Sequence, residues 1–387
     1  MRHLFSKHSS SLLAATGLVL SACSHGTAVS TAAAAPPAPA QAPVVAAPAD
    51  AMPDRLSDKE YWALEQEISE PGGYFQIRDN FTSNEMEIGQ LFTMIRDAHV
   101  SGDVYMGVGP EQNFTYIAAI RPRMAFVVDI RRQAVVQHLM FKAMFEMAKD
   151  RADFISLLFA KPRPAGLDAS TPIPKMWEAY RTVASDSNLK KHNWPLVVDR
   201  LTKTHGFTFT TDEMDMLKLV FDAFYSYGPS IATRGYAAGR GGDFTDLTGF
   251  SNDASGQPKS FLSSEENYQY LRMMNEKNLI MPVSGDFGGP KTIRAIGAYL
   301  NQHHGVLRAF YVSNVEQYLF QDGKEYAFYD NLATVPIDST SVFIRPYSMR
   351  RFGGGGPTQS LCPIGAYLVI AKQHRIAGYN GSLACGQ

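Results

Sequence analysis

VYMGVGPEQNFTYIAAIRPRMAFVVDI, residues 104–130, is the stretch from which the architecture of this chain follows. It begins with a β-branched and aromatic run over residues 104–108 and ends with a second such run over residues 124–130, and each run predicts a strand. Between them, residues 113–120 are compatible with a short helix that Pro122 ends. A strand, a helix and a second strand in this order predict a β-α-β unit.

The rest of the chain repeats this alternation. We expect an amphipathic helix after Asp129 and another over residues 292–303. Capping boxes, in which Ser or Thr is followed three residues later by Glu, predict four more helix starts: Ser57 with Glu60, Thr82 with Glu85, Thr210 with Glu213, and Ser263 with Glu266. Further strands are expected over residues 279–283, 306–312, 341–344 and 366–371. The sequence therefore predicts an α/β fold with a doubly wound, mostly parallel sheet, a helical insertion at about residues 151–260 and a long loop over residues 235–258.

Leu20-Ser21-Ala22-Cys23 closes an N-terminal segment with a basic start, an apolar stretch and small residues before a cysteine. The segment resembles the signal of bacterial lipoproteins, in which that cysteine is lipidated. We therefore expect residues 1–22 to be a lipoprotein signal peptide, Cys23 to carry lipid, and the membrane of the cell envelope to be a partner of the protein. Ser24 is not acidic, which favours the outer membrane, facing the periplasm. The alternative is an ordinary secretory signal with a chance cysteine.

Composition separates a tether from a folded domain. Residues 23–53 are rich in Ala and Pro and cannot bury a core, so we expect an extended tether before a domain over residues 54–387. The whole chain has 36 basic and 37 acidic residues, and this balance argues against a nucleic-acid partner.

The cysteines predict a disulfide bond. With Cys23 assigned to lipid, Cys362 and Cys385 remain, and a compartment outside the cytoplasm permits them to pair. Two buried free thiols are the alternative. No set of Cys and His residues with zinc-site spacing is present in the sequence, so we expect no metal.

The turn after the first strand is the first candidate site. Gly107 and Gly109 precede the helix, and Asp129 ends the next strand about 20 positions further on, the offset expected of a dinucleotide-binding fingerprint. In such folds the glycines let the backbone approach a ligand, and the acid accepts hydrogen bonds from ribose hydroxyls. Glu111, near the helix N-terminus, is a further candidate cofactor-binding residue, and capping of the free amides by its own carboxylate is the other interpretation. The alternative is a tight turn beside a surface aspartate.

Two later loops carry further candidates. GDFGGPKT, residues 285–292, departs from a P-loop because Pro290 has no N–H to offer a phosphate. It is either a simple turn or a cleft lined by Asp286, Lys291 and the free amides around Gly288. Asn314 follows the next strand, where open α/β sheets place their crevice, with a helix cap as the alternative.

The stretch over residues 104–132 resembles the first β-α-β unit of class I S-adenosylmethionine-dependent methyltransferases. Together with IMPVSGDFGGPKTIRAIGAYL and VLRAFYVSNVEQYL, it is similar to an uncharacterised bacterial family described only as methyltransferase-like. The resemblance covers about residues 57–345 and implies a Rossmann-like fold, with Gly107 and Gly109 as cofactor-loop glycines and Asp129 as the ribose-binding acid. Tyr105 and the Pro110-Glu111 pair depart from the enzyme pattern, which carries an acid and a third glycine at these places.

These observations favour an envelope-anchored lipoprotein whose methyltransferase-like domain binds a small ligand or an envelope partner, without methyl transfer in its compartment. S-adenosylmethionine is the cofactor that the resemblance implies, although the envelope has no obvious supply of it. The alternative is a true enzyme acting on an envelope substrate at the same crevice, with Asp286 and Asn314 orienting or polarising the reacting group. A structural scaffold is a third hypothesis.

Overall fold

A six-stranded sheet with the order β5-β2-β1-β6-β7-β8 lies at the centre of the domain. The computed structural model describes residues 51–76, 80–85, 88–233, 235–236, 242–347 and 358–382, which all belong to one compact unit. The predicted signal peptide, Cys23 and nearly all of the predicted tether lie outside the described residues.

The expected β-α-β unit is confirmed. β1 (Val104–Gly107) and β2 (Met124–Asp129) pair in parallel, with Val104 opposite Met124, and α3 (Gln112–Ile120) connects them. β5 (Ile280–Ser284) pairs with β2 on one side, and β6 (Leu307–Tyr311) pairs with β1 on the other. The order of the sheet therefore changes direction between β1 and β6, which is where α/β folds of this kind place their ligand crevice.

The sheet ends in an antiparallel hairpin. β7 (Val342–Tyr347) is parallel to β6, and β8 (Thr358–Pro363) is antiparallel to β7. The prediction of a mostly parallel sheet in an α/β fold is thus confirmed, with β8 as its antiparallel strand.

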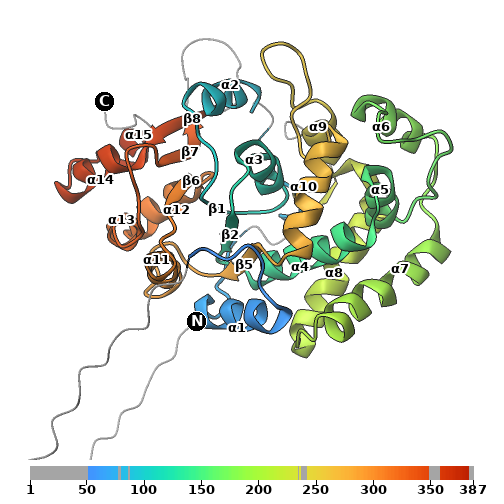
Figure 1. Cartoon of the computed structure of the whole chain (residues 1–387), viewed down its shortest axis with the longest axis horizontal. Helices are drawn as coiled ribbons and strands as arrows, with labels where there is room; N and C mark the ends of the chain where they lie inside the picture. Colours follow the sequence, from blue (N-terminus) through green and yellow to red (C-terminus); the bar gives the residue numbers. More distant parts are fainter. Residues whose placement is uncertain are drawn as a thin grey trace, which may run out of the picture. The chain divides into compact units, whose positions relative to one another are not determined.

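Helices cover both faces of the sheet. In Figure 1 the sheet extends from β8 near the top to β5 near the bottom, with α3, α4 (Arg132–Met147) and α10 (Glu265–Glu276) on one side. α11 (Thr292–Gln302) and α13 (Glu325–Leu332) lie on the other side, where α11 contacts both α13 and α1 (Asp58–Ile68). Because both faces are covered, every residue of β1, β2 and β5 is buried.

Helices also make up most of the segment between α4 and α10. Its elements are α5 (Arg151–Phe159), α6 (Ile173–Arg181), α7 (Ser187–Asp199), a π-helical turn (Arg200–Thr204), α8 (Thr211–Tyr227), a 3₁₀ turn (Gly228–Ser230), β3 (Ile231–Ala232), β4 (Gly235–Tyr236) and α9 (Phe244–Gly249). The described helices elsewhere are α2 (Gly89–Asp97), α12 (Val315–Asp322), α14 (Ile364–Lys372) and α15 (Gly378–Ser382). Within the described ranges, every helix is too short or too polar to cross a bilayer.

Two predicted capping boxes are confirmed and two are wrong. Ser57 with Glu60 and Thr210 with Glu213 make both reciprocal hydrogen bonds of the motif. α10 instead begins after Ser264, whose hydroxyl accepts the Asn267 N–H, one residue later than predicted. Thr82 and Glu85 cap no helix, because α2 begins only at Gly89 and Glu85 is buried against other parts of the chain.

Two further expectations are corrected. Residues 366–371 form part of α14 rather than a strand, and its buried side chains Ile364, Tyr367, Leu368 and Ala371 follow helical spacing. The hairpin of β7 and β8 already forms the edge of the sheet at this point. The predicted loop over residues 235–258 contains α9, which Asp243 and Asp246 cap reciprocally.

Candidate functional site

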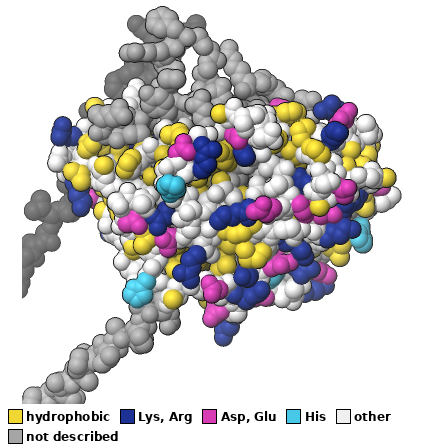
Figure 2. Space-filling model, turned by 45° about the horizontal axis from the view of Figure 1, so that its top comes forward, with side chains coloured by type: hydrophobic (Ala, Val, Ile, Leu, Met, Phe, Trp, Pro, Cys, Tyr) yellow, Lys and Arg dark blue, Asp and Glu magenta, His cyan; other side chains and the backbone are white. Residues whose placement is uncertain are grey.

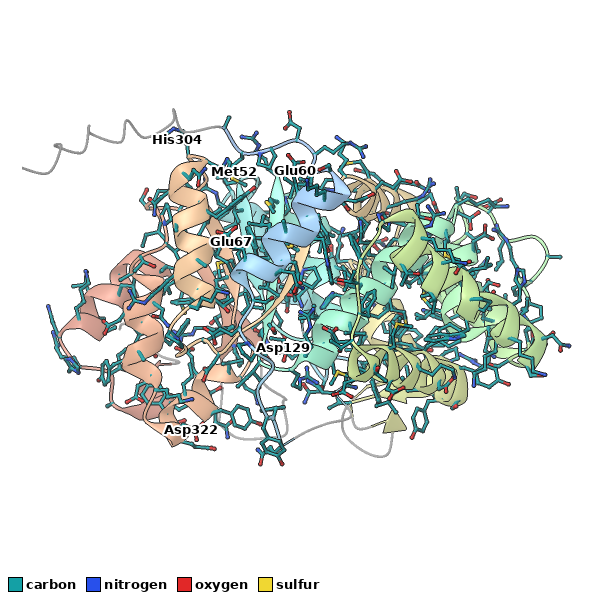
Figure 3. All side chains as sticks on the ribbon, turned by 90° about the horizontal axis from the view of Figure 1, so that it is seen from below. Met52, Glu60, Glu67, Asp129, His304 and Asp322 are labelled. Carbon is teal, nitrogen blue, oxygen red and sulfur yellow. The ribbon has the colours of Figure 1, made fainter. Side chains whose placement is uncertain are left out.

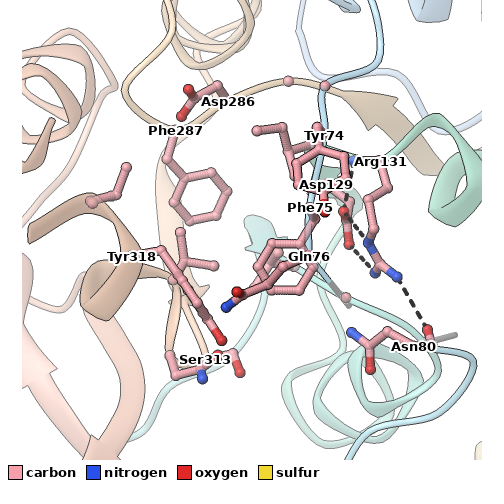
Figure 4. A pocket seen from close by; sticks show the side chains of 18 of the residues that line it. Tyr74, Phe75, Gln76, Asn80, Asp129, Arg131, Asp286, Phe287, Ser313 and Tyr318 are labelled. Carbon is pink, nitrogen blue, oxygen red and sulfur yellow. Dashed lines mark hydrogen bonds and ion pairs between the residues drawn. The ribbon is translucent and has the colours of Figure 1, made fainter. Parts of the chain in front are cut away.

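A pocket of about 650 Å³ lies at the carboxyl ends of the strands, beside the point where the strand order reverses. Its walls come from the turn after β1, the end of β2, the loop after β5, one side of α12 and a segment over residues 70–76, which we call the strap. Figure 4 shows strap residues Phe75 and Gln76 and the α12 residue Tyr318 inside the pocket, between Asp286 and Asn80.

The structure brings four of the predicted site residues to this pocket. Gly109, Asp129, Asp286 and Asn314 all line it, each at or just after the carboxyl end of a different strand. In Figure 3, Asp129 and Asp322 lie on one side of the domain, and Met52 and His304 lie on the opposite side. The carboxyl ends of parallel strands meet at one edge, which explains why residues so far apart in sequence converge.

Gly107 and Glu111 are not among the lining residues. A Cβ atom on Gly107 would lie 1.9 Å from the Asn113 Oδ1 atom, so side-chain packing requires the glycine here. The Glu111 carboxylate does not cap α3 as expected, but accepts the Ser83 backbone N–H at 3.0 and 3.1 Å. Burial raises the pKa of Glu111 to about 8.

Asn113 holds the turn after β1. Its Nδ2 atom donates to the carbonyl oxygens of Val108, Gly109 and Pro110 at 3.0, 3.1 and 2.8 Å. Gly109 has a φ of 81°, a conformation that favours glycine. The turn is therefore stabilised by a side chain of the following helix, and its carbonyls already have a donor.

His138 on α4 contacts the same turn. Its Nε2 atom lies 2.9 Å from the Gly109 carbonyl oxygen. Burial lowers the pKa of His138 to about 4, so the ring is neutral at pH 7 and Nε2–H is the donor. His138 consequently contributes to the shape of the turn.

Asp129 is held by a neighbouring cation. Arg131 donates from Nε and Nη2 to the two carboxylate oxygens of Asp129 at 3.0 and 2.8 Å, and both side chains are buried. Arg131 also reaches the Asn80 carbonyl oxygen, as the dashed lines in Figure 4 show. The carboxylate predicted to receive ribose hydroxyls is thus neutralised by a bidentate ion pair.

The amides of the loop after β5 are not free, which corrects the expectation for residues around Gly288. Glu70 accepts the backbone N–H groups of Lys291 and Thr292 at 2.8 and 2.9 Å, at the N-terminus of α11. Gly288 N–H donates to Asp286 Oδ1 at 2.9 Å. The anion site of this loop therefore holds a carboxylate of the protein itself.

Asp286 and Asn314 differ in whether their side chains have partners within the protein. Asp286 pairs with Lys324, whose Nζ atom lies 2.7 Å from Oδ2. The Asn314 side chain is exposed, and among the described residues it has no hydrogen-bond partner. Asn314 is therefore the predicted residue that remains available to a ligand.

Sequence reasoning missed Glu85 behind the pocket wall. Its carboxylate accepts from the Ser313 hydroxyl at 2.8 Å and from the Gln359 amide at 2.7 Å. Burial raises the pKa of Glu85 to about 7, since no cation of the described chain pairs with it. Ser313 itself has a φ of 44°, an uncommon conformation for serine.

Sequence reasoning also missed the strap. Gly73 N–H donates to the Ile130 carbonyl oxygen at 2.7 Å, and a Cβ atom on Gly73 would lie 2.6 Å from Ile130 Cγ1. The Gly72-Gly73 pair was the available signal, because glycines permit such a close approach between segments.

The described residues contain no cluster of three or more His, Cys, Asp or Glu side chains placed to hold a metal ion. Cys362 is disulfide-bonded, and its predicted partner Cys385 lies outside the described residues.

Comparison with known families gives one match. The family described as "Domain of unknown function (DUF7790)" matches residues 80–171 and 247–363. The matched ranges contain all six strands of the main sheet and the loops of Gly109, Asp129, Asp286 and Asn314, but neither the strap nor α6 to α8. No curated protein matches the chain.

Proposed function

The chain belongs to the DUF7790 family, and we propose that its Rossmann-like domain binds a small organic molecule in the pocket at the carboxyl ends of the strands. One observation carries the proposal: four residues that the sequence marks as candidates, at the carboxyl ends of four strands, line a single pocket of about 650 Å³. This volume lies in the range of small-molecule sites, and the place is the one that open α/β sheets use.

The resemblance to methyltransferases supports the fold more than the reaction. Asp129 is paired with Arg131, and the Asn113 side chain holds the turn after β1. S-adenosylmethionine is a cytoplasmic metabolite, whereas residues 1–23 resemble a lipoprotein signal. We therefore propose an envelope-anchored binding protein, lipidated at Cys23, which does not transfer methyl groups in its compartment.

The face drawn in Figure 2 gives no sign of a nucleic-acid surface. Figure 2 shows basic and acidic side chains interspersed over the face that it draws. A nucleic-acid binder requires basic residues gathered on one surface.

Native mass spectrometry of the full chain, purified in mild detergent from its own cells, tests the binding function. We expect a bound species with the mass of a small organic molecule. Asn314→Trp places bulk at the pocket and should abolish that species, whereas Lys372→Trp, on an exposed position of α14 outside the pocket, should retain it. An empty wild-type protein would contradict the proposal.

The proposed localisation in the cell envelope is tested separately. The full chain should sediment with membranes and carry lipid on an N-terminal Cys23, and Cys23→Ser should release it. An unprocessed chain in the cytosol would contradict envelope anchoring. It would also remove the objection to S-adenosylmethionine as a ligand.

The alternative is an enzyme that uses the same pocket. The Asn314 side chain favours this alternative, because it is exposed and has no hydrogen-bond partner among the described residues. Isothermal titration of the full chain with S-adenosylmethionine and S-adenosylhomocysteine distinguishes the two functions. Micromolar binding of both would favour the enzyme, and no detectable heat would favour the binding protein.

A further inference from the structure

The pocket offers few backbone donors to a phosphate group. At the N-terminus of α11, the amides of Lys291 and Thr292 already donate to the Glu70 carboxylate. In the turn after β1, Pro110 has no N–H. Phosphate-bearing ligands are bound by clusters of such amides, so this pocket is poorly suited to them.

Charge at the pocket favours a cation. Among the described lining residues, four are acidic (Glu70, Asp129, Asp286 and Asp322) and two are basic (Arg131 and Lys324). Both basic side chains are held in ion pairs, with Asp129 and Asp286 respectively. The exposed Asp322, at the end of α12, adds a carboxylate that makes no direct ion pair in the described chain and interacts with Lys324 only at longer range.

Aromatic rings supply the second feature. Tyr74 and Phe75 on the strap and Tyr318 on α12 line the pocket. The rings of Phe75 and Tyr318 meet edge to face with centroids 5.0 Å apart, and Tyr74 is 74% exposed. Figure 4 shows Tyr74 and Phe75 near Asp129, and Tyr318 across from them.

The structure already contains a cation beside one of these rings. The Arg131 guanidinium carbon lies 5.8 Å from the centroid of Phe75. Rings bordered by carboxylates attract cations electrostatically, and organic ammonium ligands are recognised in this way.

We propose that the pocket takes an organic cation with a planar ring, which lies against Phe75 and Tyr318 with its charge toward Asp322. This inference rests on the proposed function, because it names the chemical class of the small molecule. It excludes nucleotides and sugar phosphates as the preferred ligands.

Three compounds with one ring test the proposal. Isothermal titration of the full chain at pH 7.5 compares 1-methylnicotinamide, which is cationic, with neutral nicotinamide and anionic nicotinate, and ADP serves as the phosphate probe. We expect 1-methylnicotinamide to bind about tenfold or more tightly than nicotinamide, as a cation against aromatic rings should. Nicotinate and ADP should bind more weakly than nicotinamide.

Matched variants locate the effect. Asp322→Asn should weaken binding of the cation about threefold and leave nicotinamide unchanged, since it removes one nearby charge. Asp330→Asn, on an exposed position of α13 outside the pocket, is the control and should change neither. Tyr318→Leu keeps apolar bulk and should weaken the cation more than nicotinamide.

Failure of the cation proposal can be distinguished from failure of the proposed binding function. Tighter binding of nicotinamide, nicotinate or ADP at the pocket would overturn the cation proposal and leave small-molecule binding standing. Binding of none of the four probes would also overturn it, and native mass spectrometry then decides the proposed function independently.

Discussion

The Glu70 carboxylate accepts the backbone N–H of Thr292 at 2.9 Å, across 222 positions of sequence. It accepts the Lys291 N–H as well, so the first side chain of the strap caps the helix that follows β5. The same side chain lines the pocket. The residue that caps α11 therefore also occupies backbone amides that a phosphate group would need.

Glu70→Ala should lower the free energy of unfolding by about 1–2 kcal/mol, because the first amides of α11 lose their acceptor. The midpoint of urea unfolding measures the change. Glu67→Ala, at an exposed position of α1, is the matched control and should shift stability by less than about 0.5 kcal/mol. Equal effects of the two variants would mean that the cap contributes nothing.

Asn113→Asp should destabilise the protein by about 2–3 kcal/mol, because Asp keeps the shape of Asn but cannot donate to the buried carbonyls of Val108 and Pro110. Thermal unfolding followed by circular dichroism measures the loss. Tyr105→Phe removes only the hydroxyl that donates to Asn113 Oδ1 and should cost about 1 kcal/mol. A fully stable Asn113→Asp variant would show that the turn keeps its shape without these bonds.

Glu85 and Glu111 should make the fold less stable as pH rises. Burial raises their folded-state pKa values from 4.5 to about 7 and about 8, so the folded protein binds more protons than the unfolded chain. The stabilisation is full below pH 4.5 and is lost as pH rises through about 7 for Glu85 and about 8 for Glu111. His138, with a pKa lowered to about 4, is neutral in the folded state above pH 6.5 and adds nothing there.

Urea unfolding at pH 6.5, 7.5 and 8.5, a range of about two units chosen around these two pKa values, measures that loss. Glu85→Gln and Glu111→Gln cannot ionise and should each flatten the decline. Parallel curves for the wild type and both variants would rule out this origin of the pH dependence.

Arg131→Gln should cost about 3 kcal/mol, because it leaves the buried Asp129 carboxylate without its cation. Asp129→Asn should cost a similar amount, and the double variant should cost clearly less than the sum of the two. Chemical denaturation of the four proteins completes the double-mutant cycle. Additive losses would mean that the two charges do not interact.

A peptide map without reductant should join Cys362 to Cys385. Reduction should then lower stability by roughly 3 kcal/mol, the chain-entropy contribution of a closed loop of about two dozen residues. Mass spectrometry identifies the linked peptides. A link from Cys362 to Cys23 would contradict both this pairing and the lipidation of Cys23.

Local patterns were sufficient for much of the architecture. The β-branched runs around Val104 and Val127 and the helical spacing after Asp129 predict elements that the structure contains, because strand and helix periodicity depend on neighbours in sequence. The convergence of Gly109, Asp129, Asp286 and Asn314 on one edge followed from the rule for parallel strands. The run over residues 366–371 was misassigned because a short apolar run fits a strand and a buried helix equally well.

Those local patterns could not predict contacts between segments that are far apart in sequence. Thr82 and Glu85 have the spacing of a capping box, yet Glu85 bonds Ser313 and Gln359, 228 and 274 positions away. The spacing around Glu111 likewise favoured a cap, whereas its carboxylate bonds Ser83. A buried carboxylate takes whichever donors the assembled chain brings to it, because leaving it without partners costs more than giving up a local cap. Periodicity in the chain was thus enough to specify strands, helices and the edge at which their loops meet. The hydrogen-bond partners of Glu70, Glu85 and Glu111 depend instead on segments that become neighbours only when the domain packs. Those partners determine which polar groups of the pocket remain available to a ligand.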